Sequence, residues 1–191
     1  MAITLVLLWL FQEPISTYMI TVISSTNRPN SMSLVVAKAY QEILSAHQQE
    51  SQLLDLQDLP ADFAGPQLFG AKSDVWKGIE ERFIIGADKL VFVIPEYQGS
   101  FPGVLKSFLD GNAPRNFYQK KAAIVGVSDG IAGNLRGQEH LTGILHYLKM
   151  HVHFSKPKLS QINTLIDPQG QWLNPAAERM LRDHVMDFMS Y

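Results

Sequence analysis

The 191-residue chain contains no cysteine. This absence excludes disulfide bonds, thiolate nucleophiles, cysteine-ligated zinc or iron–sulfur centres and C-x-x-C redox chemistry. If the protein transfers electrons, a bound group must therefore carry them.

The sequence also lacks a strong charge of either sign. It has 16 Lys and Arg against 18 Asp and Glu, which gives a formal net charge of −2. Binding to a nucleic-acid backbone requires clustered Lys and Arg, so we expect no nucleic-acid partner. A chain of this length favours one domain with a real hydrophobic core.

Residues 1–18 differ from the rest of the chain. Ala2 to Phe11 form a ten-residue apolar run, which is shorter than the roughly 20 residues needed to span a bilayer. Neither the basic start nor the small-residue cleavage site of a secretory signal is evident. We expect a cytoplasmic protein without a membrane partner, with an apolar appendage at 1–18 and one domain at 19–191. Two interpretations of the appendage stay open. Either the chain's start was assigned in error upstream of a true start at Met19, or the segment is ordered and packs on its own domain or on a neighbouring subunit.

From Met19 onward, short apolar runs alternate with amphipathic stretches, as is typical of an α/β sandwich. The pattern predicts strands at 20–24, 52–56, 90–94, 122–127 and 152–154. It predicts helices at about 33–49, 75–87, 102–111, 135–150 and 174–188. The second helix is predicted from an apolar stripe of Val75, Ile79, Phe83 and Ala87. Five strands that alternate with five helices indicate a doubly wound parallel sheet.

Ligands of such sheets bind beyond the carboxyl ends of the strands, where the strand order reverses. The first strand is followed there by a loop at 24–33 that is rich in hydroxyl groups and contains one arginine, Arg28. The start of a helix offers unpaired amides and the positive end of a dipole, so this loop suits a phosphate. The alternative is a Ser- and Asn-rich turn that only caps the helix. The loop has neither the Walker A pattern nor a G-x-G-x-x-G fingerprint.

The third strand is followed by the most specific motif in the chain. Residues 95–110 read P-E-Y-Q-G-S-F-P-G-V-L-K-S-F-L-D. This segment resembles the P-E-Y-N-x-S-x-P-G-x-L-K-N-x-x-D motif of the NADPH-dependent FMN reductases, a flavodoxin-like family that includes quinone, azo and chromate reductases. It departs from the motif at Gln98 and Ser107, where family members usually or often have Asn.

The resemblance extends to the other two loops. Residues 25–33 match the family's G-S-x-R-x-x-S-x-N phosphate motif, with Ser25 in place of Gly and Ser33 in place of Asn, and residues 128–133 match its S-x-G-x-x-G turn. It implies a flavodoxin-like three-layer sandwich whose five-stranded parallel sheet has the order 2-1-3-4-5 and helices on both faces. The residues it implies for FMN binding are Thr26, Arg28, Ser31, Ser33, Pro95, Glu96, Tyr97, Gln98, Gly99, Ser100, Ser128, Gly130 and Gly133.

The resemblance also implies an activity. Bound FMN would accept hydride from NADPH or NADH and pass electrons to a small acceptor such as a quinone, an azo compound, free flavin or a metal oxyanion. A homodimer or tetramer is implied as well. No side chain is required as a catalytic group, since the cofactor carries the chemistry. Two alternatives remain: an FMN-binding electron carrier of the flavodoxin type, and a protein that keeps the fold but has lost the flavin.

The histidines do not predict a metal site. His151 and His153 alternate along the fifth predicted strand and His146 is nearby. No Asp, Glu or Cys at neighbouring spacing completes a ligand set. We therefore expect no metal.

Overall fold

A computed structural model describes residues 18–191, so the proposed appendage, apart from Tyr18, lies outside the described residues. Their strands form one parallel sheet in the order β2-β1-β3-β4-β5, with β6 also paired to β4. This confirms the predicted order. The strands are β1 (Ile20–Ser24), β2 (Ser51–Asp55), β3 (Lys89–Pro95), β4 (Lys121–Val127), β5 (His151–Val152) and β6 (Lys158–Leu159).

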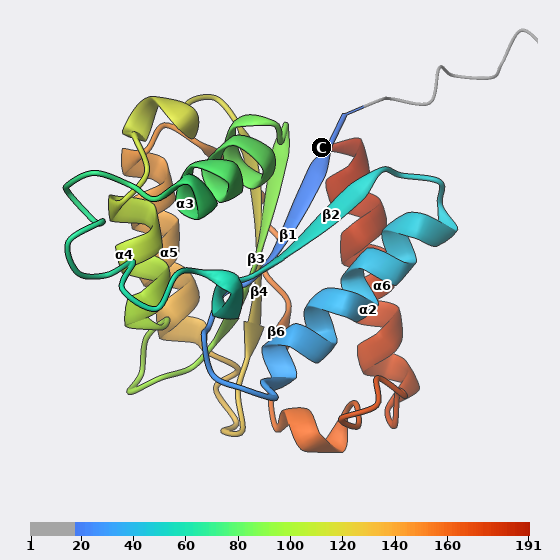
Figure 1. Cartoon of the computed structure of the whole chain (residues 1–191). Coiled ribbons are helices and arrows are strands. Elements are labelled where there is room, and N and C mark those ends of the chain that lie inside the picture. The colour runs from blue at the N-terminus through green and yellow to red at the C-terminus, as the bar shows by residue number, and fades with distance from the viewer. Residues whose placement is uncertain (1–17) are drawn as a thin grey trace, which may run out of the picture.

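Helices cover both faces of the sheet, which gives the three predicted layers (Figure 1). One face is covered by α2 (Met32–Ala46) and α6 (Pro175–Ser190). The other is covered by α3 (Asp74–Ile79), α4 (Gly103–Asp110) and α5 (Leu135–Tyr147). Two short 3-10 turns that border the sheet are η1 (Leu56–Asp58) and η4 (Ile162–Thr164).

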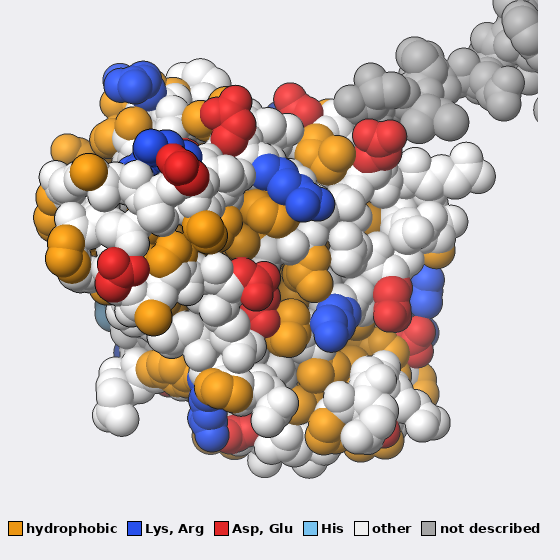
Figure 2. All heavy atoms as spheres, in the orientation of Figure 1, with side chains coloured by type: hydrophobic (Ala, Val, Ile, Leu, Met, Phe, Trp, Pro, Cys, Tyr) orange, Lys and Arg blue, Asp and Glu red, His pale blue; other side chains and the backbone are white. Residues whose placement is uncertain are grey.

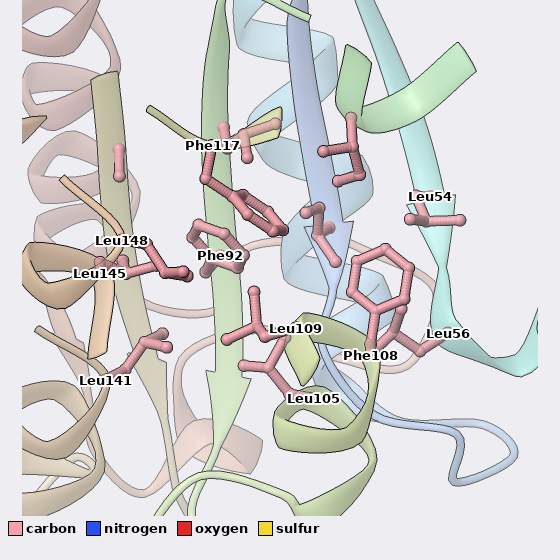
Figure 3. Close-up of a cluster of buried hydrophobic side chains, with 14 of the residues drawn as sticks. Leu54, Leu56, Phe92, Leu105, Phe108, Leu109, Phe117, Leu141, Leu145 and Leu148 are labelled. Atoms are coloured by element: carbon pink, nitrogen blue, oxygen red, sulfur yellow. The ribbon is translucent and has the colours of Figure 1, made fainter. Parts of the chain in front are cut away.

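The central strands are buried on both faces, as expected for a parallel sheet with helices on each side. Every residue of β3 is buried, and its side chains alternate between the two hydrophobic clusters. Figure 3 shows Phe92 of β3 among leucines of α4 and α5. Because β1, β3 and β4 run in the same direction, their carboxyl ends lie along one edge, where three loops begin.

The fifth strand differs from the prediction at 152–154. β5 ends at Val152, and Phe154 is 80% exposed. The chain then leaves the sheet and returns as β6, which pairs with the far end of β4 at Gly126 and Val127. The edge strand is thus split in two by residues 153–157, and the carbonyl of Pro157 at the end of this break accepts from the Gly126 amide at 2.9 Å. A short, interrupted pairing of this kind carries little alternating pattern in the sequence.

The helix predicted at 75–87 differs from the structure in its helical geometry. Helix α3 ends at Ile79, and residues Glu80–Ile85 form a π-helical turn, η2. A π turn adds a residue to the helical repeat, so Ile79 is followed on the buried side by Ile84, five positions later. Trp76 is fully buried while Val75 is 61% exposed. The predicted stripe was therefore wrong at Val75.

The last helix agrees with the prediction. Asn174 is its N-cap, and the side-chain oxygen accepts from the amides of Ala176 at 2.9 Å and Ala177 at 3.2 Å. Its C-terminal end lies beside the start of β1 (Figure 1). There Lys89 donates to the carbonyls of Phe188 at 3.1 Å and Met189 at 2.9 Å, which supplies a cation to carbonyls at the negative end of the helix dipole.

The surface carries both signs of charge. Figure 2 shows Lys, Arg, Asp and Glu interspersed over the face that it displays, among scattered apolar side chains. Within residues 18–191, no helix has both the length and the apolar character that crossing a membrane requires.

One buried titratable group stands out in the layer formed by α2 and α6. His184 of α6 is only 3% exposed, and neither ring nitrogen has a partner within the described chain. Its ring lies edge-on to Tyr40 of α2 and to His153, with centroid separations of 5.9 and 5.5 Å. Burial, together with the neighbouring His153, lowers the pKa of His184 to about 3. His153 in turn lies 3.3 Å from the carboxylate of Asp187.

This burial predicts an acid-sensitive fold. An unfolded chain takes up a proton at the ordinary histidine pKa of about 6.5, whereas folded His184 stays neutral down to about pH 3. Stability is therefore lost as the pH falls through that window, by about 1–2 kcal/mol at pH 5. His184→Phe fills the same apolar site without binding a proton. We expect thermal unfolding at pH 7 and pH 5 to show a smaller drop in midpoint for this variant than for the wild type.

The control is His47→Phe, because His47 is exposed at the end of α2. It should leave the wild-type pH dependence unchanged. Equal drops in midpoint for His184→Phe and the wild type would show that His184 does not control the acid response.

Candidate functional site

A cavity of about 400 Å³ lies at the carboxyl edge of the sheet, where the three loops meet. Seven of the sequence-predicted residues line it: Arg28, Ser31, Ser33, Pro95, Glu96, Tyr97 and Ser128. It is also lined by residues that were not predicted: Pro29, Asn30, Met32, Val127, Asp129, Ile162 and Asn163. The loops that follow β1, β3 and β4 are thus brought together, as expected for a parallel sheet.

The first loop presents the start of α2 to the cavity. Ser31 is the N-cap of that helix, and its hydroxyl accepts from the Leu34 amide at 3.2 Å. The amides of Met32 and Ser33 have no acceptor within the helix, because they belong to its first turn. No acidic residue occupies that turn. Capping and anion binding are therefore compatible functions of the same loop.

Two side chains of this loop add to its suitability for an anion. Arg28 is exposed and forms no ion pair with any described residue of the chain. The hydroxyl of Ser33 is buried, and no hydrogen-bond partner for it occurs in residues 18–191. A buried hydroxyl normally has a partner. The arrangement of a helix start, a free guanidinium and an unpartnered hydroxyl fits a phosphate group.

Thr26, which was also predicted to bind FMN, makes hydrogen bonds within and between the loops. It is buried and does not line the cavity. Its hydroxyl accepts from the Arg28 amide at 3.2 Å and lies 3.0 Å from the hydroxyl of Tyr97. Thr26 thus fixes the shape of the first loop and joins it to the second.

The second loop is a tight turn from Tyr97 to Ser100. The two residues exchange backbone hydrogen bonds of 2.8 and 3.1 Å. Gln98 and Gly99 between them both have positive φ, 52° and 74°, as in the type I′ turns of hairpins. None of the three residues from Gln98 to Ser100 lines the cavity. Ser100 is held from the other side, since its hydroxyl lies 2.9 Å from Nδ1 of His140 on α5.

Glu96 connects the second loop to the third. Its amide donates to the Val127 carbonyl at 2.9 Å, which extends the pairing of β3 with β4. Its carboxylate lines the cavity and also accepts from the amide of Asn134, the N-cap of α5, at 3.2 Å. A carboxylate in that position is favourable because it faces the positive end of the helix dipole.

The two glycines of the third loop do not line the cavity. The Gly130 carbonyl accepts hydrogen bonds from the Ser128 hydroxyl at 2.8 Å and from the Gln161 amide at 3.2 Å. Gly133 has a φ of 58°, and a Cβ added there would lie 2.6 Å from Cβ of Lys158. Both glycines therefore serve the packing of this loop against β6 and the segment that follows it.

That segment, at the start of η4, is the part of the site that the sequence analysis missed. Ile162 and Asn163 line the cavity, and the Asn163 amide group donates to the Asp129 carboxylate at 3.0 Å. The only signal in the sequence is the helical spacing of Leu159, Ile162 and Ile166, all of which are buried. That spacing reports packing and gives no indication of a binding site.

A second cavity, of about 670 Å³, lies along α6 and residues 155–158. None of the predicted residues lines it. It is a wide depression with Lys156, Arg179 and Asp187 around it, whereas the smaller cavity lies at the switch point of the sheet. We therefore consider the smaller cavity the functional site.

Two of the histidines make side-chain contacts within the fold. His151 lies 2.8 Å from the side-chain oxygen of Gln119, and His153 lies against Asp187. Within residues 18–191, no three His, Asp or Glu side chains are arranged so that they could hold a metal ion.

Comparison with known proteins identifies relatives of this architecture. Residues 18–162 match the family model of NADPH-dependent FMN reductases. The chain is 37% identical over 113 residues to an NAD(P)H-dependent FMN reductase of Pseudomonas aeruginosa, covering 55% of this chain and 60% of the relative. It is 42% identical over 106 residues to a 2-hydroxy-1,4-benzoquinone reductase of a Burkholderia species, covering 52% and 57%. The chain thus spans about three fifths of the length of these relatives.

A solved structure shows the same fold over nearly the whole chain. It is the flavoenzyme NAD(P)H:(acceptor) oxidoreductase FerB of Paracoccus denitrificans, with a TM-score of 0.76 and 21% identity. The match covers 91% of this chain and 96% of the other. At this identity the likeness establishes the fold.

The turn at 97–100 yields a test of its backbone strain. Asn tolerates the left-handed conformation better than Gln, so Gln98→Asn should raise the free energy of unfolding by a few tenths to about 1 kcal/mol. Gly99→Ala should lower it by about 1 kcal/mol, because φ is positive there and the space is open apart from Arg136 Nη1 at 3.6 Å. Urea unfolding measures both. If both variants change the free energy of unfolding in the same direction, the positive φ angles at 98 and 99 do not strain this turn.

Proposed function

Because the family model matches residues 18–162, the chain belongs to the NADPH-dependent FMN reductase family, and we propose that it is an FMN-dependent NAD(P)H oxidoreductase that reduces a small-molecule acceptor. The observation that carries the proposal is the cavity of about 400 Å³ in which all three predicted loops meet. When bound, FMN supplies the hydride and electron transfer that a chain without cysteine does not provide through thiols.

The first loop would hold the FMN phosphate. The amides of Met32 and Ser33 and the hydroxyls of Ser31 and Ser33 supply hydrogen-bond donors, and Arg28 supplies the positive charge. The hydroxyl of Ser33, which has no hydrogen-bond partner in residues 18–191, supports this assignment, since a phosphate oxygen would supply one. The departure of Ser33 from the family's Asn therefore still leaves a suitable donor at the site.

The second and third loops would hold the flavin ring. Pro95, Glu96 and Tyr97 form one wall of the cavity, and Ser128 lies on another. The pairing of Glu96 with Val127 and the bond from Tyr97 to Thr26 fix these walls relative to one another. The chain's part in the reaction is to orient the ring and to keep one face open to the reactants. The remaining predicted residues would act indirectly, through the shape of the loops. They are Thr26, Gln98, Gly99, Ser100, Gly130 and Gly133.

The acceptor classes that we propose are quinones, azo compounds, free flavin and metal oxyanions. The benzoquinone reductase relative supports the first of these.

A homodimer or tetramer stays a prediction, as does a cytoplasmic location. The surface best suited to a second copy is an apolar groove of about 400 Å³ between α4 and α5. It is lined by Leu109, Ile144 and Tyr147, the last of which is 84% exposed.

The direct test is anaerobic reduction of the FMN-loaded protein. We expect a yellow protein whose absorbance near the flavin maximum bleaches within seconds of adding NADPH, and recovers when benzoquinone follows. Bound FMN that neither nicotinamide bleaches would indicate an electron carrier. Failure to bind FMN would indicate a protein that keeps the fold without the flavin.

The assignment of the phosphate site is tested with Arg28→Ala. The variant loses a charged hydrogen bond to the phosphate, so the Kd for FMN should rise about ten-fold, the equivalent of about 1.4 kcal/mol. The Kd for riboflavin, which has no phosphate, should change less than two-fold. Fluorescence titration measures both. Arg115→Ala, which removes an exposed arginine outside the cavity, is the control. Equal losses for FMN and riboflavin would show that Arg28 does not bind the phosphate.

A further inference from the structure

The cavity of about 670 Å³ beside α6 has no part in the proposed function. One wall is α6, which covers the same face of the sheet as α2 (Figure 1). The other wall is formed by residues 155–158, which lead from β5 into β6. The cavity shares no lining residue with the one assigned to FMN. Its volume falls within the roughly 300–1,000 Å³ that is usual for small-molecule sites, so it can hold a ligand of its own.

His184 is the buried polar side chain of this lining, with 3% of its surface exposed. Neither ring nitrogen has a hydrogen-bond partner among residues 18–191. The ring packs edge-on against Tyr40 and His153 and nearly parallel to Phe188. A phenylalanine would pack there without leaving a polar atom unbonded, and buried polar groups normally have partners. A ligand in the adjoining cavity would supply the missing partner.

Arg179 is the available cation on the α6 wall. It recurs with Asp183 and Asp187 at intervals of four residues, so the three side chains lie along one side of the helix. Asp187 is engaged by His153, whose Nε2 lies 3.3 Å from its carboxylate. Arg179 is exposed and forms no ion pair with any described residue, Asp183 included. Its guanidinium is therefore free to bind an anion that enters the cavity.

The opposite wall carries two lysines, Lys156 and Lys158, on either side of Pro157. Lys156 pairs with Glu139 at 2.9 Å, whereas Lys158 is exposed and has no ion pair within residues 18–191. With Arg179, the described lining contains three cations against the two carboxylates of α6. One positive charge is thus in excess, which suits a ligand with a single negative charge. A dianion would carry uncompensated charge beside the two carboxylates.

The rest of the lining is partly apolar, because Pro157, Ala176 and Met180 contribute to it. An inorganic ion in a cavity of this size would leave that apolar surface facing water, whereas an organic ligand would cover it. Among organic monoanions, a carboxylate matches a guanidinium because its two oxygens accept a pair of parallel hydrogen bonds. The lining therefore fits a small organic acid.

We propose that this cavity is a binding site for a small organic monocarboxylate, whose charge is bound by Arg179 and Lys158 and which accepts a hydrogen bond from His184. Burial, together with the neighbouring His153, lowers the pKa of His184 to about 3, so the ring is neutral and carries one N–H to donate. The apolar body of the ligand packs against Pro157. The inference does not rest on the proposed function, because the two cavities have separate linings.

The test is calorimetric titration of the whole chain with benzoate at pH 8. The titration is run with excess FMN, which occupies the other cavity, and again without it. The ligand controls are benzamide, a neutral molecule of the same shape, and phenyl phosphate, a dianion at this pH. The variants are Arg179→Ala, Arg179→Lys and His184→Phe. Arg182→Ala is the control variant, because Arg182 lies on the same helix, pairs with Glu178 and does not line the cavity.

For the wild type we expect a single benzoate site with a Kd below about 1 mM, with and without FMN. Benzamide and phenyl phosphate should bind about ten-fold more weakly or worse. Arg179→Ala should raise the Kd for benzoate about ten-fold, Arg179→Lys should recover part of the loss, and Arg182→Ala should match the wild type. His184→Phe should raise the Kd about five-fold, through loss of one hydrogen bond. In ¹⁵N spectra, benzoate should shift the ring nitrogens of His184 and leave those of the exposed His47 unchanged.

The proposal would be overturned if the wild type showed no saturable binding of benzoate, or if Arg179→Ala and the wild type had the same Kd. Displacement of benzoate by FMN would also overturn it, since the acid would then lie in the other cavity. Tighter binding of phenyl phosphate than of benzoate would refute the assignment to monocarboxylates, and unchanged nitrogen resonances would exclude His184 from the site. A protein that binds benzoate as expected but does not oxidise NADPH would instead overturn the proposed function.

Discussion

The site depends on a backbone hydrogen-bond ladder that continues past the ends of the strands. The amide of Ser25 donates to Val93 at 3.0 Å, that of Glu96 to Val127 at 2.9 Å and that of Ser128 to Leu159 at 3.1 Å. The first residue of each loop is thereby still part of the sheet. Because β1, β3 and β4 are buried and paired in parallel register, the starting points of the three loops are fixed relative to one another. The cavity is therefore positioned by the buried, hydrogen-bonded centre of the sheet.

Side-chain bonds then join each loop to the next. Thr26 bonds with Tyr97, Glu96 accepts from Asn134, and Ser100 is held by His140. None of these bonds uses the groups best suited to a phosphate, which are Arg28 and the hydroxyl of Ser33. The loops are thus held by one set of polar groups while another set stays available. That separation is what pre-organisation of a binding site requires.

The sequence predicted the parts of the fold that have a strong local pattern. The first strand, at 20–24, and the three loops after β1, β3 and β4 agree with the structure, because apolar runs and specific motifs mark them. The split edge strand and the π-helical turn at Glu80–Ile85 were missed, since the first consists of two very short pairings and the second shifts the helical repeat by one residue. Ile162 and Asn163 were missed too, because the apolar spacing in their segment indicates packing alone. For Gly133 the structure shows a packing reason for glycine that the motif alone does not reveal, because a Cβ there would lie 2.6 Å from Cβ of Lys158.

The charges that line the cavity bear on the acceptor. Among the described residues that line it, Arg28 is the one cation, and Glu96 and Asp129 contribute two carboxylates. Once a phosphate engages Arg28, the rest of the lining is negative. A metal oxyanion would then approach against like charge, whereas a neutral quinone would not. Because the Glu96 carboxylate is fixed by the amide of Asn134 and that of Asp129 by Asn163, neither can easily turn away. Among the proposed acceptor classes, the lining therefore favours neutral aromatic molecules.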